Sequence, residues 1–274
     1  MNPSSHPARV LRGQPPATEA ETRVVIVGAA GRMGSALREV LGQFPDVHLV
    51  GAVDREPDAS RGISTDLESV LRGADVMIDF SSPASTVSNL AACARHGVAA
   101  LVGTTGLSDE AERAATEASS RIPVLIAANT SLGVTLLIEL VRQAARALPA
   151  DFDIEITEGH HRYKKDAPSG TALALGRAAA EGRGQTLEAV RGVAREGEVS
   201  RKSGEIGFSV IRAGDLVGDH VVLFGGEGER ITLGHQATDR AIFARGALKA
   251  ASWLSGRAPG RYRMVDVLGL KTRT

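Results

Sequence analysis

The sequence predicts an α/β protein in which a doubly wound parallel sheet is followed by a smaller mixed α+β domain. Three observations support this prediction. Between residues 23 and 129, short apolar runs alternate with segments of helical spacing, which is typical of a parallel sheet covered by helices. A glycine-rich turn follows the first apolar run. From residue 206 to residue 235, alternating apolar segments are separated by glycine-rich turns, as in antiparallel strands.

The composition excludes several classes of protein. The chain has 274 residues, and its 32 basic and 32 acidic side chains balance, which argues against a nucleic-acid binder. The single cysteine, Cys93, excludes a disulfide framework and is typical of a cytoplasmic protein. We expect no membrane span, because no apolar run is long enough. Residues 1–22, rich in Pro, Ser, Ala and Glu, are expected to be a disordered tail.

The first predicted strand, residues 24–27, leads into a glycine turn and a helix. The motif reads Gly28-Ala-Ala-Gly31-Arg-Met-Gly34. Gly28 permits the tight turn, Gly31 lets a pyrophosphate approach the backbone, and Gly34 lets the helix pack on the strand. The spacing G-x-x-G-x-x-G is not the commoner G-x-G-x-x-G, so the turn alone is weak evidence for a dinucleotide site.

The second predicted strand, residues 47–53, ends at an acid followed by a base. Asp54 lies about 20 residues after Gly34, where an acid meets the ribose hydroxyls of NAD. Arg55 can pair with the 2′-phosphate of NADP. The pair therefore leaves NADH and NADPH both open. A solvated pair at a strand end is the alternative.

Three more strands are predicted at residues 75–80, 98–102 and 122–127, with helices at 84–96 and after Ser108. Residues 55–73 are expected to be a linker with one helix. Ligands bind at the carboxyl ends of parallel strands. Here these ends carry Gly28, Asp54, Phe80, Gly103-Thr-Thr-Gly and Asn129. Small polar residues and glycine at every strand end indicate a Rossmann-like nucleotide crevice.

The rest of the chain predicts a second domain and a return to the first. A helix at 132–148 and a strand reaching residue 157 come first, and 181–205 is expected to be loop, with a possible strand at 191–193. Antiparallel strands are predicted at 206–212, 217–224 and 230–235. An apolar helix at 241–254 and a last strand or short helix at 262–270 would return to the first domain. We therefore expect a cofactor domain from residues 23–129 and 240–274, and a substrate and oligomerisation domain from residues 130–239. Open sheets of this kind often pair between subunits.

The segment 154–175 holds most of the chemistry. His160 and His161 are adjacent and are followed by Lys164, and Ser169 or Thr171 can cap the next helix. A helix start beside basic side chains suits a small anion, and a histidine can move a proton at neutral pH. A basic surface loop before an ordinary helix is the alternative. A metal site is a further alternative, which lacks a cysteine and a third ligand at suitable spacing.

Six motifs together resemble the dihydrodipicolinate (4-hydroxy-tetrahydrodipicolinate) reductase family of bacterial lysine and diaminopimelate biosynthesis. They are Val-Gly-Ala-Ala-Gly-Arg-Met-Gly, Ile-Asp-Phe-Ser-Ser-Pro, Val-Gly-Thr-Thr-Gly, Ala-Ala-Asn, Arg-Ala-Gly-Asp and Glu-Gly-His-His-Arg-Tyr-Lys-Lys-Asp-Ala-Pro-Ser-Gly-Thr-Ala. The resemblance covers about residues 23–270, and the histidine motif is highly specific to the family, whereas the glycine turn is not. The chain departs at Thr130, where many members have an aromatic residue, at Ser82, where some have arginine, and in a shorter linker after Asp54.

The resemblance implies an oxidoreductase, a cytoplasmic homotetramer that uses NADH or NADPH to reduce 4-hydroxy-tetrahydrodipicolinate to tetrahydrodipicolinate with loss of water. It makes His160 a proton donor or acceptor and Lys164 a second proton donor. It assigns binding of the dicarboxylate substrate to His161, Lys164, Ser169, Gly170 and Thr171. It assigns cofactor binding to Gly28, Ala29, Ala30, Gly31, Arg32, Met33, Asp54, Arg55, Gly103, Thr104, Thr105, Ala127, Ala128, Asn129 and Thr130. We add Phe80 because it ends a strand at the same edge.

Two rivals share part of this pattern. A dehydrogenase of another small acid, such as an aspartate dehydrogenase, would share the glycine turn and Asp54 but would not need the His-His-x-x-Lys element. A regulatory protein that binds NAD(P)H without turnover would lack the proton donors. The sequence leaves open whether His160 or His161 faces the substrate, because neighbours on an extended segment point to opposite sides.

Overall fold

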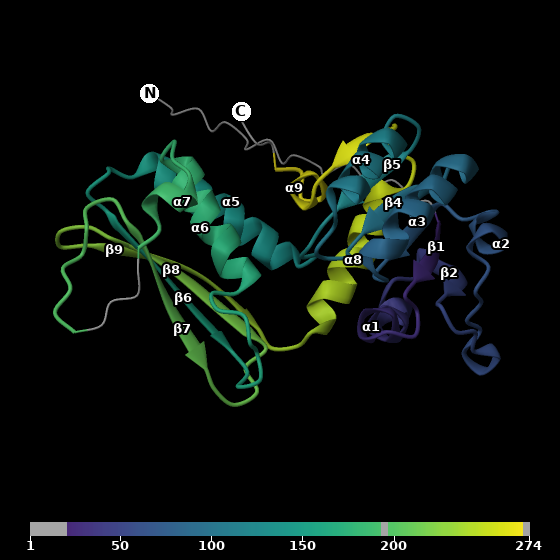
Figure 1. Ribbon diagram of the computed structural model, residues 1–274, viewed down its shortest axis with the longest axis horizontal. Coiled ribbons are helices and arrows are strands. Elements are labelled where there is room, and N and C mark those ends of the chain that lie inside the picture. Colours follow the sequence, from purple (N-terminus) through teal and green to yellow (C-terminus); the bar gives the residue numbers. More distant parts are fainter. Residues whose placement is uncertain (1–20, 193–196, 271–274) are drawn as a thin grey trace, which may run out of the picture.

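The computed structural model describes residues 21–192 and 197–270, and these form two sheets at opposite ends of the molecule (Figure 1). The six-stranded sheet has the order β10-β5-β4-β3-β1-β2, and the four-stranded sheet has the order β7-β6-β8-β9. The predicted fold class is therefore confirmed. No helix in the described ranges has the length and apolar character needed to cross a lipid bilayer.

Every strand pair in the six-stranded sheet is parallel. The strands are β1 (Thr22–Val27), β2 (Val47–Val53), β3 (Val76–Asp79), β4 (Ala99–Val102), β5 (Pro123–Ile126) and β10 (Gly260–Tyr262). β1 to β5 match the predicted apolar runs closely, because a strand buried on both faces needs apolar side chains at nearly every position. β10 instead precedes most of the range 262–270, predicted as a last strand or short helix, and that range contains a short helix. β1 begins at Thr22, which is buried, although this residue was assigned to the tail; residues 1–20 of that tail lie outside the described ranges.

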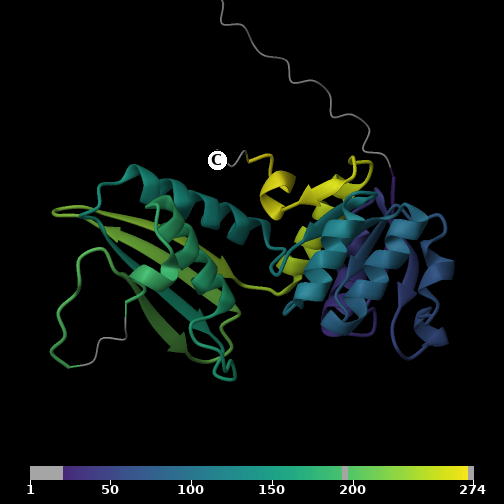
Figure 2. The same ribbon diagram turned by 45° about the horizontal axis from the view of Figure 1, so that its top comes forward.

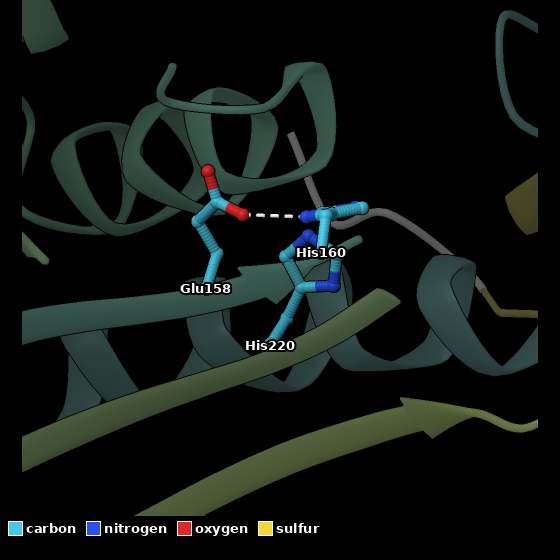
Figure 3. Close-up of side chains that lie close together, drawn as sticks. All are labelled: Glu158, His160 and His220. Atoms are coloured by element: carbon cyan, nitrogen blue, oxygen red, sulfur yellow. Dashed lines mark hydrogen bonds and ion pairs between the residues drawn. The ribbon is translucent and has the colours of Figure 1, made fainter. Parts of the chain in front are cut away.

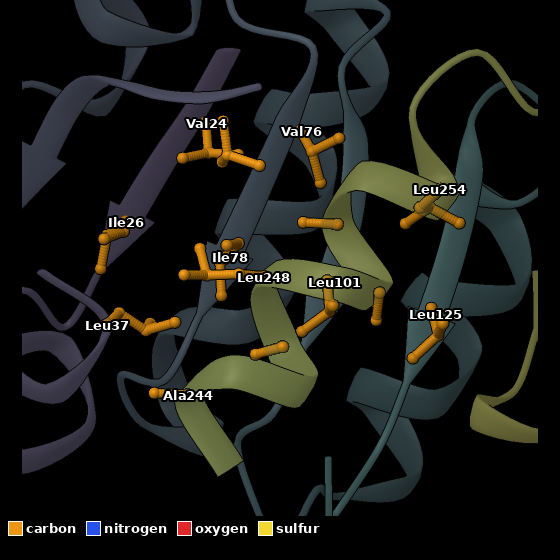
Figure 4. Packing of buried hydrophobic residues seen from close by; sticks show 14 of the residues in the cluster. Val24, Ile26, Leu37, Val76, Ile78, Leu101, Leu125, Ala244, Leu248 and Leu254 are labelled. Carbon is orange, nitrogen blue, oxygen red and sulfur yellow. The ribbon is translucent and has the colours of Figure 1, made fainter. Parts of the chain in front are cut away.

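Helices cover both faces of this sheet. Val24 and Ile26 of β1 pack with α1 (Arg32–Val40) and α8 (Ala241–Leu254) in one cluster, which Figure 4 shows. Val25 and Val27 pack on the other side with α3 (Pro83–His96) and α4 (Asp109–Ala118). This alternation along β1 is the period of a strand. The smaller elements here are η1 (Leu41–Gln43), η2 (Ala59–Arg61), α2 (Leu67–Leu71) and α9 (Met264–Val267).

Two glycines fix how the first helix leaves the sheet. Gly28 has a φ of +79°, and a Cβ there would lie 2.5 Å from the carbonyl oxygen of Phe80. A Cβ on Gly34 would lie 2.3 Å from the carbonyl oxygen of Gly28. Helix α1 begins at Arg32 and includes Gly34, earlier than predicted, so the helix packs directly on the turn. The turn therefore keeps its backbone amides at the carboxyl edge of the sheet.

The four-stranded sheet is mixed, and this corrects the prediction of an antiparallel succession. Its strands are β6 (Asp153–His160), β7 (Ile206–Arg212), β8 (Gly218–Gly225) and β9 (Arg230–Ala237). β7 pairs parallel with β6, and β8 pairs antiparallel with β6 on its other side. β7 and β8 therefore do not form a hairpin. The turn between them crosses the end of β6, where the Ala213 amide donates to the carbonyl of His160 at 3.0 Å.

Three helices lie together over one face of this sheet, as Figures 1 and 2 show. They are α5 (Leu132–Ala147), α6 (Gly170–Gly182) and α7 (Leu187–Val190). α7 falls within residues that were predicted to be loop. Of the possible strand at 191–193, Arg191 forms an isolated parallel bridge with Ile206, and residue 193 lies outside the described ranges. The opposite face of the sheet carries no helix among the described elements.

The chain passes between the two sheets beside α8. The Thr130 hydroxyl donates to the carbonyl of Phe243 at 2.7 Å. A Cβ on Gly246 would lie 1.9 Å from the carbonyl oxygen of Thr130. The contact is backbone against backbone, so neither side can rotate away. Helix α8 therefore sets where α5 and the second sheet begin.

We predict that Gly246→Ala destabilises the protein by roughly 1–3 kcal/mol or more, because overpacking here must move backbone. Urea unfolding of the variant and the parent measures this. Gly42→Ala is the matched control, since a Cβ on Gly42 meets nothing within 4 Å. Equal stability of Gly246→Ala and the parent would contradict the tight crossing.

Candidate active site

Two adjoining cavities lie at the carboxyl ends of the parallel strands. The larger, about 1000 Å³, is lined by Gly28, Ala30, Gly31, Asp54, Arg55 and Phe80 of the predicted cofactor residues. The smaller, about 550 Å³, is lined by Phe80, Arg32, Met33, Gly103, Thr104, Thr105, Ala128, Asn129 and Thr130. Ala29 and Ala127 line neither cavity and are buried beneath them. Fourteen of the sixteen predicted residues therefore line one or the other of these two cavities, which share Phe80 and together are called the groove below.

Asp54 joins the second strand to the glycine turn. One of its carboxylate oxygens accepts a hydrogen bond from the Ala30 amide at 2.8 Å. The other accepts from the Arg55 amide, also at 2.8 Å. The carboxylate is thereby fixed on the wall of the larger cavity, where it can accept from a ribose hydroxyl.

A serine loop that the sequence reading did not assign lines both cavities. It contains Ser81 and Ser82 and follows Asp79, a fully buried carboxylate at the end of β3. Asp79 accepts from the Ser81 amide at 2.8 Å and from the side-chain amide of Asn89 at 3.1 Å. A buried carboxylate needs such donors, so Asp79 holds the loop in place. The signal was present in the Ile-Asp-Phe-Ser-Ser-Pro motif, which shows an acid before two hydroxyls but not its burial.

The predicted proton donor His160 lies at the end of β6, beside a carboxylate on the same strand face (Figure 3). The Nδ1 atom of His160 is 2.5 Å from a carboxylate oxygen of Glu158, which is only 1% exposed. Residues two apart on a strand point to the same side. This spacing was the available signal for Glu158, which the sequence reading missed.

Glu158 is also held by two other segments. Arg212, at the end of β7, donates to both carboxylate oxygens at 2.8 and 2.9 Å. The Ser169 amide donates to one of them at 3.0 Å. Burial alone would raise the pKa of Glu158, but the bonds from Arg212 and His160 hold that pKa below its ordinary value. Glu158 is therefore a permanent carboxylate at neutral pH.

The charge state of His160 follows from its surroundings. Burial lowers the pKa of His160, and the Glu158 carboxylate opposes part of this effect. The resting imidazole is therefore mainly neutral, with its Nδ1–H donating to Glu158. Its Nε2 atom lies near Gly218, where a Cβ would be 3.2 Å away. When Nε2 takes up a proton, the adjacent carboxylate stabilises the imidazolium.

A second histidine that the sequence reading missed packs against the first. His220 of β8 is 4% exposed, and its ring meets that of His160 edge to face with centroids 5.1 Å apart. Its Nε2 atom is 3.0 Å from the hydroxyl of Ser169. Burial lowers the pKa of His220 to about 4. His220 is therefore neutral at physiological pH.

The three side chains in Figure 3 bear on the metal alternative. Ligand atoms of Glu158, His160 and His220 lie within 4.8 Å of one another, so His160 has two candidate co-ligands that sequence spacing did not reveal, and His161 is not one of them. However, both carboxylate oxygens of Glu158 already accept hydrogen bonds from Arg212. A metal ion would have to displace the guanidinium. The hydrogen bonds that Glu158 makes thus compete with metal binding at this cluster.

The residues of the predicted anion site lie at the start of α6. Ser169 caps this helix, because its hydroxyl accepts from the Ala172 amide at 3.2 Å. The Ser169 amide itself donates to Glu158, so it is not available to a ligand. The amides of Gly170 and Thr171 lie in the first helical turn, which has no intrahelical partner for them. They remain the donors for an anion.

The remaining predicted residues flank this helix start. The Lys164 ammonium pairs with Asp166 at 2.9 Å. The Nδ1 atom of His161 is buried and has no hydrogen-bond partner among the described residues. The side-chain amide of Asn129 donates to the hydroxyl of Thr171 at 3.2 Å. Because Asn129 lines the smaller cavity, this bond places the helix start at the end of the cofactor groove.

Comparison with known proteins agrees with the motif resemblance. A family model described as dihydrodipicolinate reductase, N-terminus, matches residues 22–130, and one described as the C-terminus matches residues 133–268. The 4-hydroxy-tetrahydrodipicolinate reductases of Zymomonas mobilis and Alkalilimnicola ehrlichii are 51% and 48% identical to this chain. The alignments cover 92% and 91% of this chain and 99% of each relative. The predicted family and the prediction of an oxidoreductase are confirmed.

Solved structures with a similar fold include a member of the same family. Dipicolinate-bound dihydrodipicolinate reductase from Paenisporosarcina sp. TG-14 matches with a TM-score of 0.75 at 26% identity, over 89% of this chain and 98% of that one. The DAP dehydrogenase of C. glutamicum in complex with DAP matches with a TM-score of 0.54 at 16% identity, over 90% and 94% of the two chains. The second match shows the shared fold alone.

We predict that Glu158→Gln lowers kcat about tenfold or more, because the neutral amide no longer stabilises the imidazolium of His160. Loss of the negative charge also lowers the pKa of His160 further. If His160 must be protonated to act, the fall in kcat at high pH moves to lower pH. The measurement is kcat against pH for the variant and the parent.

Glu155→Gln is the matched control for this prediction. Glu155 lies on the same strand as Glu158 but on its opposite face. The control should keep the parental pH profile. A Glu158→Gln profile that also matches the parent would contradict a role for Glu158 in setting the protonation of His160.

Proposed function

This chain belongs to the dihydrodipicolinate reductase family, and we propose that it reduces 4-hydroxy-tetrahydrodipicolinate to tetrahydrodipicolinate with loss of water, using NADH or NADPH. The observation that carries this proposal is the Asn129–Thr171 hydrogen bond. It joins the cofactor groove to a helix start that is built for a carboxylate. A hydride donor in the groove and a dicarboxylate at the helix would therefore be neighbours.

The groove fits a dinucleotide on its own geometry. Gly28 and Gly31 line the larger cavity with backbone, as a pyrophosphate requires, and Gly34 lets α1 pack on this turn. Asp54 on the wall of the larger cavity suits a ribose, and the smaller cavity, near Asn129, would then receive the nicotinamide end. When bound, the cofactor supplies a hydride to ring C4 of the substrate.

The choice between NADH and NADPH rests on two neighbours at the end of β2. The Asp54 carboxylate suits the free ribose hydroxyls of NADH. The Arg55 guanidinium suits the 2′-phosphate of NADPH. Both side chains line the larger cavity. Measuring kcat/KM with each cofactor in the same assay determines the preference.

The substrate carboxylates would be held from two sides. The Gly170 and Thr171 amides and the Ser169 hydroxyl would bind one carboxylate at the helix start. Lys164 would exchange Asp166 for the other carboxylate, and His161 would add a contact. This arrangement fixes the ring relative to the groove, so that one face receives hydride. A lysine near the ring can also serve as a second proton donor.

His160 would complete the reaction by proton transfer. After hydride delivery and loss of water, the ring is an enamine that needs a proton at C3. The imidazolium of His160 would give that proton from Nε2 while its Nδ1–H stays on Glu158. A proton transfer of this kind contributes about 10²–10⁴ in rate. The carboxylate of Glu158 keeps the ring oriented throughout.

We also propose a separate role for each domain and an oligomeric state. Residues 23–129 with 240–274 would bind cofactor, and residues 130–239 would bind substrate and oligomerise. The sheet face that carries no helix presents Val221, Leu223 and Ile211, which supports pairing with further copies into a homotetramer. We place the enzyme in the cytoplasm, where reduced nicotinamide cofactors are available.

The test of the function is oxidation of NADH or NADPH with substrate made in place from pyruvate and aspartate semialdehyde by the preceding synthase. Turnover that requires the synthase product supports the proposal. Folded protein that binds cofactor but does not turn over would instead support a sensor or another substrate. Cofactor affinity is therefore also measured with and without pyridine-2,6-dicarboxylate, a planar analogue of the substrate. Tighter cofactor binding in the presence of the diacid would support the reductase, because neither a sensor nor a dehydrogenase of another acid should bind this diacid.

We predict that His160→Gln lowers kcat by about 10²–10⁴ with a modest change in KM, because the amide cannot carry a proton to C3. Steady-state kinetics in the same assay provide the measurement. His48→Gln, an exposed histidine on β2, serves as the control and should keep the parental kcat. Parental kcat in His160→Gln would remove this residue from proton transfer.

We predict that Lys164→Ala raises KM and lowers kcat, because one carboxylate loses its cation and the ring loses its orientation. Lys165→Ala is the matched control, since Lys165 is the exposed neighbour. The control should change neither constant appreciably. If both variants behave alike, the lysine is not a carboxylate clamp.

A further inference from the structure

His220 has no assigned part in the reaction, yet its position is closely defined. It lies on β8, buried beside the site, with its Nε2 atom 3.0 Å from the hydroxyl of Ser169. The Ser169 hydroxyl also accepts from the Ala172 amide at 3.2 Å. This hydroxyl has two lone pairs and one proton. What His220 does with Nε2 therefore decides where that proton points.

The two neutral tautomers of His220 have opposite consequences. If the proton is on Nδ1, Nε2 accepts from Ser169, and the hydroxyl has no proton left for a ligand. The Nδ1–H would then be a buried donor, and Nδ1 has no hydrogen-bond partner among the described residues. If the proton is on Nε2, His220 donates to Ser169, and Nδ1 is a buried acceptor that also lacks a partner among the described residues. An unpaired buried donor or acceptor costs about 1–3 kcal/mol, so the Nδ1 atom does not decide between the tautomers. Only the Nε2–H tautomer leaves the Ser169 hydroxyl a proton for a ligand.

We propose that His220 is a positioning residue that donates from Nε2 to the Ser169 hydroxyl and so directs the single proton of that hydroxyl toward a substrate carboxylate. Both lone pairs of the hydroxyl are then occupied, one by Ala172 and one by His220. The O–H can only donate outward, past the start of α6. The proposal rests on the proposed function, because it assigns Ser169 to a dicarboxylate.

The surroundings keep His220 in the neutral form that this role needs. Burial is the main cause of its low pKa, and the neighbouring His160 lowers that pKa further. The other titratable groups facing it are Glu158 on β6, Lys164 in the following loop and His235 on β9. Glu158 acts in the opposite direction but is paired with Arg212. His220 therefore does not titrate near neutral pH.

The experiment compares two amides at this position. In His220→Gln the side-chain amide can reach the place of Nε2, whereas in His220→Asn it is too short. Binding of pyridine-2,6-dicarboxylate to the cofactor-saturated enzyme is measured by calorimetry. We expect the Kd to rise about tenfold or more in His220→Asn, as for loss of a hydrogen bond to a charged group, and to stay within a few-fold of the parent in His220→Gln. Cofactor Kd should not change in either variant.

A double-mutant cycle distinguishes this role from general loss of structure. In a Ser169→Ala background, His220→Asn should cause no further loss of diacid affinity, because the hydroxyl it orients is gone. His235→Asn is the control, since His235 is the cross-strand partner of His220 and lies outside the site. Additive losses, or equal losses in His220→Asn and His220→Gln, would overturn the proposal.

Two further outcomes separate this proposal from the proposed function. If Ser169→Ala weakens the diacid but His220→Asn does not, the positioning role is wrong and the function stands. If Ser169→Ala leaves diacid affinity unchanged, the carboxylate site is wrong, and the role of His220 falls with it. A diacid Kd whose pH dependence near neutrality disappears in His220→Asn would show that His220 titrates, which also overturns the proposal.

Discussion

The buried carboxylate of Glu158 is the constraint on which the second half of the molecule depends. A buried carboxylate without partners would cost several kcal/mol. Glu158 receives its donors from three places: the end of β7, the end of its own strand, and the start of α6. These three chain segments must therefore meet at one point. The residues of the predicted anion site and the proposed proton donor lie at that point. The hydrogen bonds that Glu158 requires therefore bring the candidate site residues together.

The need of Glu158 for hydrogen-bond donors also accounts for the strand order of the mixed sheet. Arg212 reaches both oxygens of Glu158 because β7 runs parallel to β6 and ends beside it. An antiparallel β7–β8 hairpin beside the sheet would give Arg212 no such place. The turn after β7 instead crosses the end of β6 and delivers β8 to its other side, which places His220 next to His160. Topology and site are therefore linked through one ion pair.

The sequence predicted the parallel sheet well and the mixed sheet less well, for a physical reason. Strands buried on both faces are continuous apolar runs, and fully buried β4 (Ala99–Val102) lies within one residue of the run predicted at 98–102. Alternation along β6 to β9 tells which side chains share a face but not which strands are neighbours. Glu158, Arg212 and His220 come together only through that strand order. The sequence had shown His160 and the helix cap, whose signals are local, and it missed their partners, which are distant along the chain.

The adjacent histidines, between which the sequence does not choose, differ in their place relative to the strand and in their neighbours. β6 extends to His160, so His160 shares a face with Glu158, and His161 follows beyond the strand end. Because Arg212 neutralises Glu158, the buried network carries no net charge while His160 is neutral. In the proposed reaction the substrate brings two carboxylates into this balanced site. Their negative potential favours protonation of His160, so arrival of the substrate itself would supply the imidazolium that the last step requires.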